Sequence, residues 1–206
     1  MLTAEHKKWL TTHAVDITLA ERLGVRSVLT QEDIPEEWRG GLGRHTPGVL
    51  LPWSSHDGRV SVQLHPDTPP INGNGEKVKY LFRKAVEPVM WEVRANPRAK
   101  KILIIEGSKQ CLVAAEYAPL EYAVYGIAGC YGWLHDGVPI ADLSVVDGRD
   151  VVVGFDADAA TNLDVYMAGT RLAEALTAEN AASIKWMRLP GAGKTAGLDD
   201  VMAKRP

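Results

Sequence analysis

The second half of the chain alternates short apolar runs with helix-like segments. The apolar runs are residues 101–105, 121–127, 150–155 and 184–189, and the helix-like segments are residues 108–117, residues 160–177 and the stretch from residue 198 onward. An unbroken run of four to five apolar residues is typical of a strand that is buried on both faces. Repeated β-α alternation therefore predicts an α/β fold, in which a parallel sheet is covered by helices on both faces.

The stretch from about residue 34 to residue 95 has a different pattern, because prolines and glycines interrupt it repeatedly. Its β-like runs are residues 48–51, 59–64, 78–82 and 89–93. His56-Asp57-Gly58 lies between the first two runs, and an Asp-Gly pair readily adopts the positive φ of a hairpin turn. We expect a smaller, antiparallel β-rich subdomain here.

The first 33 residues predict two short helices, over residues 3–13 and 16–23, with Asp16 as an N-cap. A pair of short helices is compatible with a DNA-reading helix-turn-helix. We interpret it as a packing annex, because no basic recognition face follows. The predicted organisation is a helical annex (1–33), a β-rich subdomain (34–98) and an α/β domain (99–206).

Composition narrows the class of protein without defining it. The 206 residues are 46% hydrophobic and 24% charged, with a net charge of −3, which argues against a strongly basic nucleic-acid coat protein. No apolar run reaches the length of a membrane span, and no signal-peptide core is present. The two cysteines and six histidines lack the paired spacing of a zinc site. We expect a cytoplasmic protein with no membrane partner.

Candidate chemistry lies where two of the apolar runs end in acid. Residues 101–105 lead into Glu106-Gly107, and residues 151–155 lead into Asp156-Ala157-Asp158. The carboxyl ends of parallel strands meet at one edge of a sheet, so the three carboxylates of Glu106, Asp156 and Asp158 should lie close together. Like charges at such distances require a cation, and carboxylate oxygens suit Mg²⁺ or Mn²⁺. We predict a divalent-metal site suited to phosphate chemistry.

Other charged residues near these segments have two interpretations each. Glu106 taken alone could simply be a carboxylate that is favoured at the N-terminus of the following helix. The same holds for Asp199 and Asp200 in the first turn of the last helix. The alternative is that Asp199 and Asp200 touch metal or substrate. Lys109 either reaches a phosphate or is solvated.

The acidic motifs resemble those of the TOPRIM domain, which occurs in bacterial-type primases, topoisomerases and some nucleases. Glu106-Gly107 and the following helix resemble its strand–Glu-Gly–helix motif, and Phe155-Asp156-Ala157-Asp158 resembles its Asp-x-Asp motif. Gly197-Leu198-Asp199-Asp200 is similar to a third acidic element of primase-like members. The resemblance implies a four-stranded, parallel, Rossmann-like TOPRIM sheet over residues 100–206.

The resemblance extends upstream, where residues 48–53, 56–64 and 77–81 look like the β-rich half of a bacterial primase core. It implies that basic residues of this half face the metal site and bind nucleotide or nucleic acid. The candidates are Lys77, Lys79, Arg83 and, from the motif helix, Lys109. Alternating cations on an edge strand also serve as ordinary protection against aggregation.

Overall, residues 15–204 are most similar to a primase-like TOPRIM domain of uncharacterised function in phage- and plasmid-encoded replication proteins. The sequence departs from bacterial primases in lacking their cysteine-rich zinc-binding module. It also carries Leu64-His65 where they have a basic residue after the second β run.

The resemblance implies a Mg²⁺- or Mn²⁺-dependent nucleotidyltransferase of phage or plasmid DNA replication, with Glu106, Asp156 and Asp158 as catalytic residues. Its expected partners are single-stranded nucleic acid, nucleoside triphosphates and a replicative helicase. Two alternatives stay open: a nuclease or phosphohydrolase that uses the same metal site, and a non-catalytic nucleic-acid-binding module of a larger replication protein.

Overall fold

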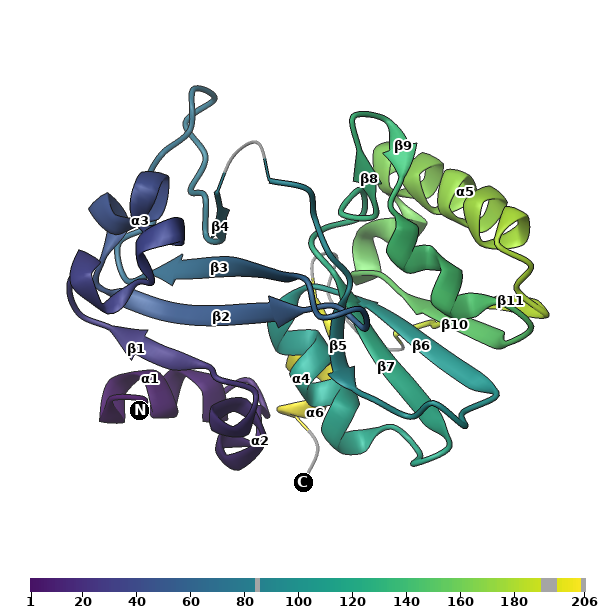
Figure 1. The fold of residues 1–206 in the computed structure, drawn as a ribbon, viewed down its shortest axis with the longest axis horizontal. Helices are drawn as coiled ribbons and strands as arrows, with labels where there is room; N and C mark the ends of the chain where they lie inside the picture. The colour runs from purple at the N-terminus through teal and green to yellow at the C-terminus, as the bar shows by residue number, and fades with distance from the viewer. Residues whose placement is uncertain (84–85, 190–195, 205–206) are drawn as a thin grey trace.

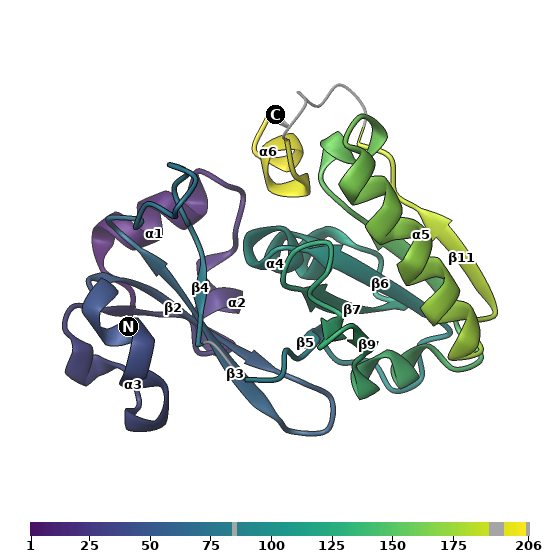
Figure 2. The same ribbon diagram turned by 90° about the horizontal axis from the view of Figure 1, so that it is seen from above.

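The computed structural model describes residues 1–83, 86–189 and 196–204, with the side chains of residues 158 and 160 outside that description. The described chain forms two lobes (Figures 1 and 2). One lobe is built around an antiparallel sheet and the other around a mainly parallel sheet. The predicted mixed α/β class is therefore confirmed.

The N-terminal lobe is an antiparallel sheet with short helices around it. Its elements are α1 (Ala4–Thr11), α2 (Ile17–Arg22), β1 (Arg26–Val28), η1 (Gln31–Asp33), α3 (Glu36–Leu42), η2 (Gly43–His45), β2 (Gly48–Ser54), β3 (Val60–Pro66) and β4 (Leu81–Phe82). The strands pair in the order β1-β2-β3-β4. The predicted hairpin turn between β2 and β3 is confirmed, and Gly58 has a φ of +87° there.

The two predicted N-terminal helices form because each has a side-chain cap. Thr3 accepts a hydrogen bond from the backbone N–H of His6 at 3.3 Å, and Asp16 accepts one from that of Leu19. Such caps satisfy backbone donors that a helix leaves open at its start. Gly24, with a φ of +82°, follows the C-cap residue Leu23 and ends the second helix.

The C-terminal lobe contains the main sheet and the longer helices. Its elements are β5 (Trp91–Arg94), β6 (Lys101–Glu106), α4 (Ser108–Tyr117), β7 (Tyr122–Ile127), β8 (Leu134–His135), β9 (Val138–Pro139), η3 (Ala141–Val146), β10 (Asp150–Gly154), η4 (Ala157–Ala160), α5 (Leu163–Ala178), β11 (Ser183–Trp186) and α6 (Leu198–Met202). Five strands pair in the order β11-β10-β6-β7-β5, and β8 and β9 form a small separate hairpin.

The main sheet differs from the prediction in having five strands rather than four. Strands β11, β10, β6 and β7 are parallel, as expected, and β5 joins the edge antiparallel to β7. Trp91 is buried on this strand and stacks on Trp53 of β2, with ring centroids 5.4 Å apart. Arg94 donates hydrogen bonds to the carbonyls of Ala118 and Pro119, at 3.0 and 2.7 Å. These contacts hold β5 against the main sheet.

Helices cover both faces of the main sheet, as the β-α alternation predicts. Successive side chains of a strand point to opposite faces. Leu103 and Ile105 of β6 therefore pack in one core with α4 and α6, while Ile102 and Ile104 pack in another with α5 and η3. Figure 2 shows that α6 lies beside α4, whereas α5 lies on the opposite side of the sheet.

The core under α4 is shared by both lobes. Leu10 of α1, Leu19 of α2 and Trp53 of β2 belong to the same buried cluster as Leu112 of α4. The N-terminal helices thus pack against the same α4 that follows Glu106. The proposed boundaries at residues 33/34 and 98/99 stay a prediction. Within the part of the chain that the structure describes, no helix is long and apolar enough to cross a membrane.

Candidate functional site

Two acidic residues lie at the carboxyl ends of neighbouring parallel strands. Glu106 is the last residue of β6, and Asp156 follows the end of β10 by two residues. The register of these strands pairs Ile105 with Gly154, so both acids leave the sheet at the same level. Glu106 and Asp156 line a single cavity of about 430 Å³. The structure therefore brings together two of the three acids that the sequence predicted.

The third acid, Asp158, belongs to the 3-10 turn η4 that follows β10. Its side chain lies outside the described part of the structure. Its contribution to the site therefore stays a prediction.

The cavity lies between the two lobes and receives residues from both. Gln63, Lys79, Tyr80 and Phe82 come from the N-terminal lobe, and Ser108, Lys109, Gln110, Ala128, Gly129, Gly197, Asp199 and Asp200 come from the C-terminal lobe. Its volume is typical of a pocket for a small molecule such as a nucleotide. Carboxylates and amines thus face one space, which is an arrangement suited to a metal and a phosphate together.

Gln110, which no sequence motif singled out, connects the acidic strand end to α6. Its Nε2 donates a hydrogen bond to Oδ1 of Asp156, and its Oε1 accepts one from the backbone N–H of Leu198 at 2.7 Å. The side chain is buried. Its position in the first turn after Glu106 was the only available signal, and glutamine is common on solvated helix faces.

Gly197 makes room for this connection. A Cβ atom at Gly197 would lie 2.6 Å from Oδ1 of Asp199 and 2.6 Å from Cδ of Gln110. Both separations are shorter than a van der Waals contact. A side chain at this position would therefore displace the Gln110 amide from Asp156.

Lys109 and Asp199 form an ion pair at the edge of the cavity. The Lys109 Nζ lies 2.8 Å from Oδ2 of Asp199, and the two side chains are only 16% and 6% exposed. The same Nζ lies 5.5 Å from the ring centroid of Trp9, in a cation–π contact. Lys109 is therefore held in place rather than solvated. Asp200 accepts a hydrogen bond from the Gly197 N–H at 3.1 Å and so caps α6 while lining the cavity.

The aromatic residues beside the cavity are held in their neutral forms. Burial raises the pKa of Tyr80, and the charges of Asp199 and Asp156 raise it further. Burial, followed by the charge of Lys109, lowers the pKa of His65 to about 4. The His65 ring lies between Trp9 and Tyr80, at centroid distances of 4.3 and 5.0 Å. At neutral pH His65 therefore supplies no positive charge beside the cavity.

The three predicted cations of the N-terminal lobe do not form one strip. Lys79 lines the cavity, whereas Arg83 lines an adjoining cavity of about 470 Å³ and donates a hydrogen bond to the carbonyl of Glu37. Lys77 forms an isolated bridge with Ile71 and lines neither cavity. The predicted strand over residues 78–82 is wrong beyond Leu81–Phe82, because only these two residues pair with β3. Strand alternation therefore does not align the cations.

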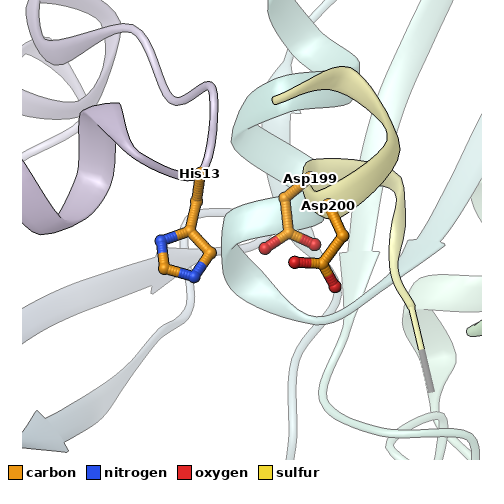
Figure 3. A group of neighbouring side chains, drawn as sticks. All are labelled: His13, Asp199 and Asp200. Atoms are coloured by element: carbon orange, nitrogen blue, oxygen red, sulfur yellow. The ribbon is translucent and has the colours of Figure 1, made fainter. Parts of the chain in front are cut away.

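A histidine from the N-terminal helices lies next to the acids of α6. His13, Asp199 and Asp200 each offer a ligand atom, and these atoms all lie within 4.8 Å of one another (Figure 3). The spacing of the histidines along the chain gave no indication of this group. His13 and the two acids are separated by nearly the whole chain, so no spacing motif indicates their proximity.

Comparisons with known proteins agree with a primase-like fold. A family model described as "Domain of unknown function (DUF3854)" matches residues 90–206, and the chain belongs to this family. The crystal structure of the Aquifex aeolicus primase (zinc binding and RNA polymerase domains) is similar, with a TM-score of 0.65 and 13% identity. The similarity covers 97% of this chain and 52% of that chain, so this chain spans about half the length of that one.

No curated protein matches the chain. The family model that matches is not a TOPRIM model, so the TOPRIM resemblance of the acidic motifs stays a prediction. The structural likeness establishes the fold, and the activity has to be argued from the residues of the cavity.

Replacing Gln110 with Leu should loosen α6. The change removes the acceptor for the Leu198 N–H and the donor to Asp156, at a cost of about 1–3 kcal/mol in the free energy of unfolding. Hydrogen exchange of the α6 amides should become faster. Gln31→Leu, at an exposed glutamine of η1, is the matched control and should leave the exchange of the α6 amides unchanged. Equal exchange rates in the wild type and Gln110→Leu would show that α6 is held by other contacts.

Proposed function

We propose that the chain is the catalytic core of a primase-like replication protein, a metal-dependent nucleotidyltransferase. One observation carries the proposal: Glu106 and Asp156, from adjacent strand ends, line the same cavity as Lys79 and Lys109. Nucleotidyl transfer needs this combination, because the negative charge of the phosphates must be offset while the attacking hydroxyl loses its proton. The primase-like fold supports the same class of reaction.

The residues on the cavity fit a divalent cation with a preference for oxygen ligands. Glu106 and Asp156 offer carboxylate oxygens, and Asp158 follows Asp156 by two residues. We assign Mg²⁺ or Mn²⁺ to these three acids, because they end or follow the neighbouring parallel strands β6 and β10. When bound, such an ion would offset charge on the transferred phosphoryl group.

The protein side chains have distinct roles in this proposal. Lys79 is exposed on the cavity wall and binds a phosphate of the triphosphate or the template. Gln110 orients Asp156 through its hydrogen bond. The Glu106 carboxylate accepts the proton of the attacking 3′-hydroxyl, whose oxygen bonds to the α-phosphorus while pyrophosphate leaves.

The proposed partners are single-stranded template and nucleoside triphosphates. A replicative helicase and a phage or plasmid setting are proposals that rest on the sequence resemblance. The net charge of −3 means that template binding has to depend on local cations such as Lys79 rather than on the overall charge.

The test supplies the protein with Mg²⁺ or Mn²⁺, labelled nucleotides, and templates with or without an annealed primer. The annealed primer separates nucleotide transfer from initiation. Primer extension supports the proposal, whether or not initiation occurs. Shortening of the template indicates a nuclease or phosphohydrolase, and binding without turnover indicates a non-catalytic module. Either of these last two results would refute the nucleotidyltransferase assignment.

Lys79→Ala should weaken binding of single-stranded DNA. The slope of log affinity against log salt concentration should also fall, by about the amount that one phosphate contact contributes. Lys77→Ala is a matched control, since Lys77 is an exposed lysine two residues away that lines neither cavity. Fluorescence anisotropy at several salt concentrations measures both. Equal losses of affinity in the two variants would contradict a specific role for Lys79 in the cavity.

A further inference from the structure

His13, Asp199 and Asp200 lie together at a place where the two ends of the chain meet. His13 follows α1, and the two acids belong to the first turn of α6. Their ligand atoms all lie within 4.8 Å of one another (Figure 3). Ligand atoms of an octahedral ion lie about 3 Å apart when adjacent and about 4.2 Å apart when opposed, so rotations of these side chains would bring all three to bonding distance.

The hydrogen bond of the His13 ring defines its tautomer. Nδ1 lies 2.8 Å from the carbonyl oxygen of Trp9. A carbonyl only accepts hydrogen bonds, so Nδ1 carries the proton and the lone pair of the neutral ring is on Nε2. Metal-bound histidines have the same arrangement, in which one ring nitrogen donates to a carbonyl and the other binds the ion.

The charges around His13 favour a cation. Asp199 and Asp200 bring two negative charges, and Lys109 pairs with only one of them. Each carboxylate has a second oxygen besides the one that accepts from Lys109 or from the Gly197 N–H. Asp199 is buried, which makes a remaining imbalance of charge costly. A divalent cation would remove it.

We propose that His13, Asp199 and Asp200 form a second cation site, specific for a divalent transition metal such as Mn²⁺, Co²⁺ or Zn²⁺. Imidazole nitrogen suits these ions, whereas Mg²⁺ prefers oxygen ligands only. Asp199 and Asp200 line the same cavity as Glu106 and Asp156, but the proposed site uses a different set of ligands and does not depend on nucleotide transfer. Its ligand His13 lies outside residues 90–206, so the family match does not include it.

The proposed site has a structural consequence. A bound ion would join α1 to α6 beside the cavity, next to the Lys109–Asp199 ion pair and Trp9. The N-terminal helices would then contribute directly to the wall of the site. The metal should raise the melting temperature of the full chain without any nucleotide present.

The test is Mn²⁺ binding to the full chain, measured by electron paramagnetic resonance of free Mn²⁺ with Mg²⁺ as competitor. The wild type should retain one Mn²⁺ in about a hundredfold excess of Mg²⁺. His13→Ala and Asp200→Asn should each weaken this binding about tenfold or more. Asp156→Asn should keep it, as should His56→Ala, which removes an exposed histidine of the β2–β3 turn.

A second measurement does not depend on any variant. Mn²⁺ at this site should broaden the NMR signals of the His13 ring in the wild type before those of His56. The proposal is overturned if Mg²⁺ displaces the Mn²⁺ in the wild type, if His13→Ala binds like the wild type, or if Asp156→Asn loses the ion. Failure of primer extension would leave it standing, since that result concerns the other acids.

Discussion

Asp156→Asn should lower the rate of nucleotide transfer by about a thousandfold while leaving the fold intact. Asparagine has the same shape and still accepts the hydrogen bond that Gln110 donates to Oδ1 of Asp156. What it lacks is the negative charge that a Mg²⁺ or Mn²⁺ ion needs at the end of β10. Primer extension measures the rate, calorimetry measures metal binding, and circular dichroism monitors the fold.

Asp150→Asn is the matched control for this prediction. Asp150 begins the same strand β10 at the opposite edge of the sheet, and its Oδ1 accepts a hydrogen bond from Ser183 that asparagine can also accept. This variant should keep the wild-type rate. A fully active Asp156→Asn, or equal loss in both variants, would remove Asp156 from the catalytic site.

The positions of Glu106 and Asp156 could be predicted because the signals are local. An apolar run marks a buried strand, and β-α alternation makes such strands parallel, so acids that end two runs meet at one edge. Both acids line the cavity as a result. The helix α4 and the hairpin turn at Gly58 were predictable for the same reason, since β-α alternation and an Asp-Gly turn are read from adjacent residues.

The sheet to which β5 belongs could not be predicted, because alternation indicates a strand but not its neighbour. Trp91 and Trp53 are far apart in sequence, and only tertiary packing brings their rings together. The positions of the candidate cations Lys77, Lys79 and Arg83 could not be predicted for a different reason. The sequence predicted a strand over residues 78–82, whereas pairing with β3 begins at Leu81, and Lys79 and Arg83 line different cavities.

Gln110 and His13 were invisible in the sequence because their partners come from the last helix. Gln110 bonds to Leu198, and His13 lies beside Asp199 and Asp200. A short helix such as α6 carries no signal for where it docks. Side chains of this kind are found only once the chain ends are placed against α4.

The buried acid Asp142 of η3 depends on Arg59 from the other lobe. The Nη2 of Arg59 forms an ion pair with Oδ1 of Asp142, and Oδ2 of Asp142 accepts a hydrogen bond from the Met90 N–H at 2.6 Å. The Asp142 side chain is fully buried, whereas that of Arg59 is 34% exposed. Removing the guanidinium therefore leaves a buried carboxylate with one neutral partner.

Arg59→Ala should lower the free energy of unfolding by roughly 2–4 kcal/mol near neutral pH, somewhat less than for a fully buried pair because Arg59 is partly in solvent. Burial already raises the pKa of Asp142, although Met90 and Arg59 act against it. Without Arg59 that pKa rises further. The folded state then takes up a proton more readily than the unfolded state. The loss of unfolding free energy in Arg59→Ala is therefore complete at pH values above the raised pKa of Asp142.

As the pH falls through that raised pKa, Asp142 becomes neutral and needs no partner, so the difference between Arg59→Ala and the wild type should shrink toward pH 4. Urea unfolding of both proteins at several pH values measures this difference. Asp142→Asn provides the control, since an amide keeps the acceptor for Met90 but has no charge to desolvate. Arg59→Ala combined with Asp142→Asn should be more stable than Arg59→Ala alone, because the charge that lacked a partner is gone. Additive losses in the double variant, or a deficit that stays constant with pH, would show that Arg59 acts through packing rather than by neutralising Asp142.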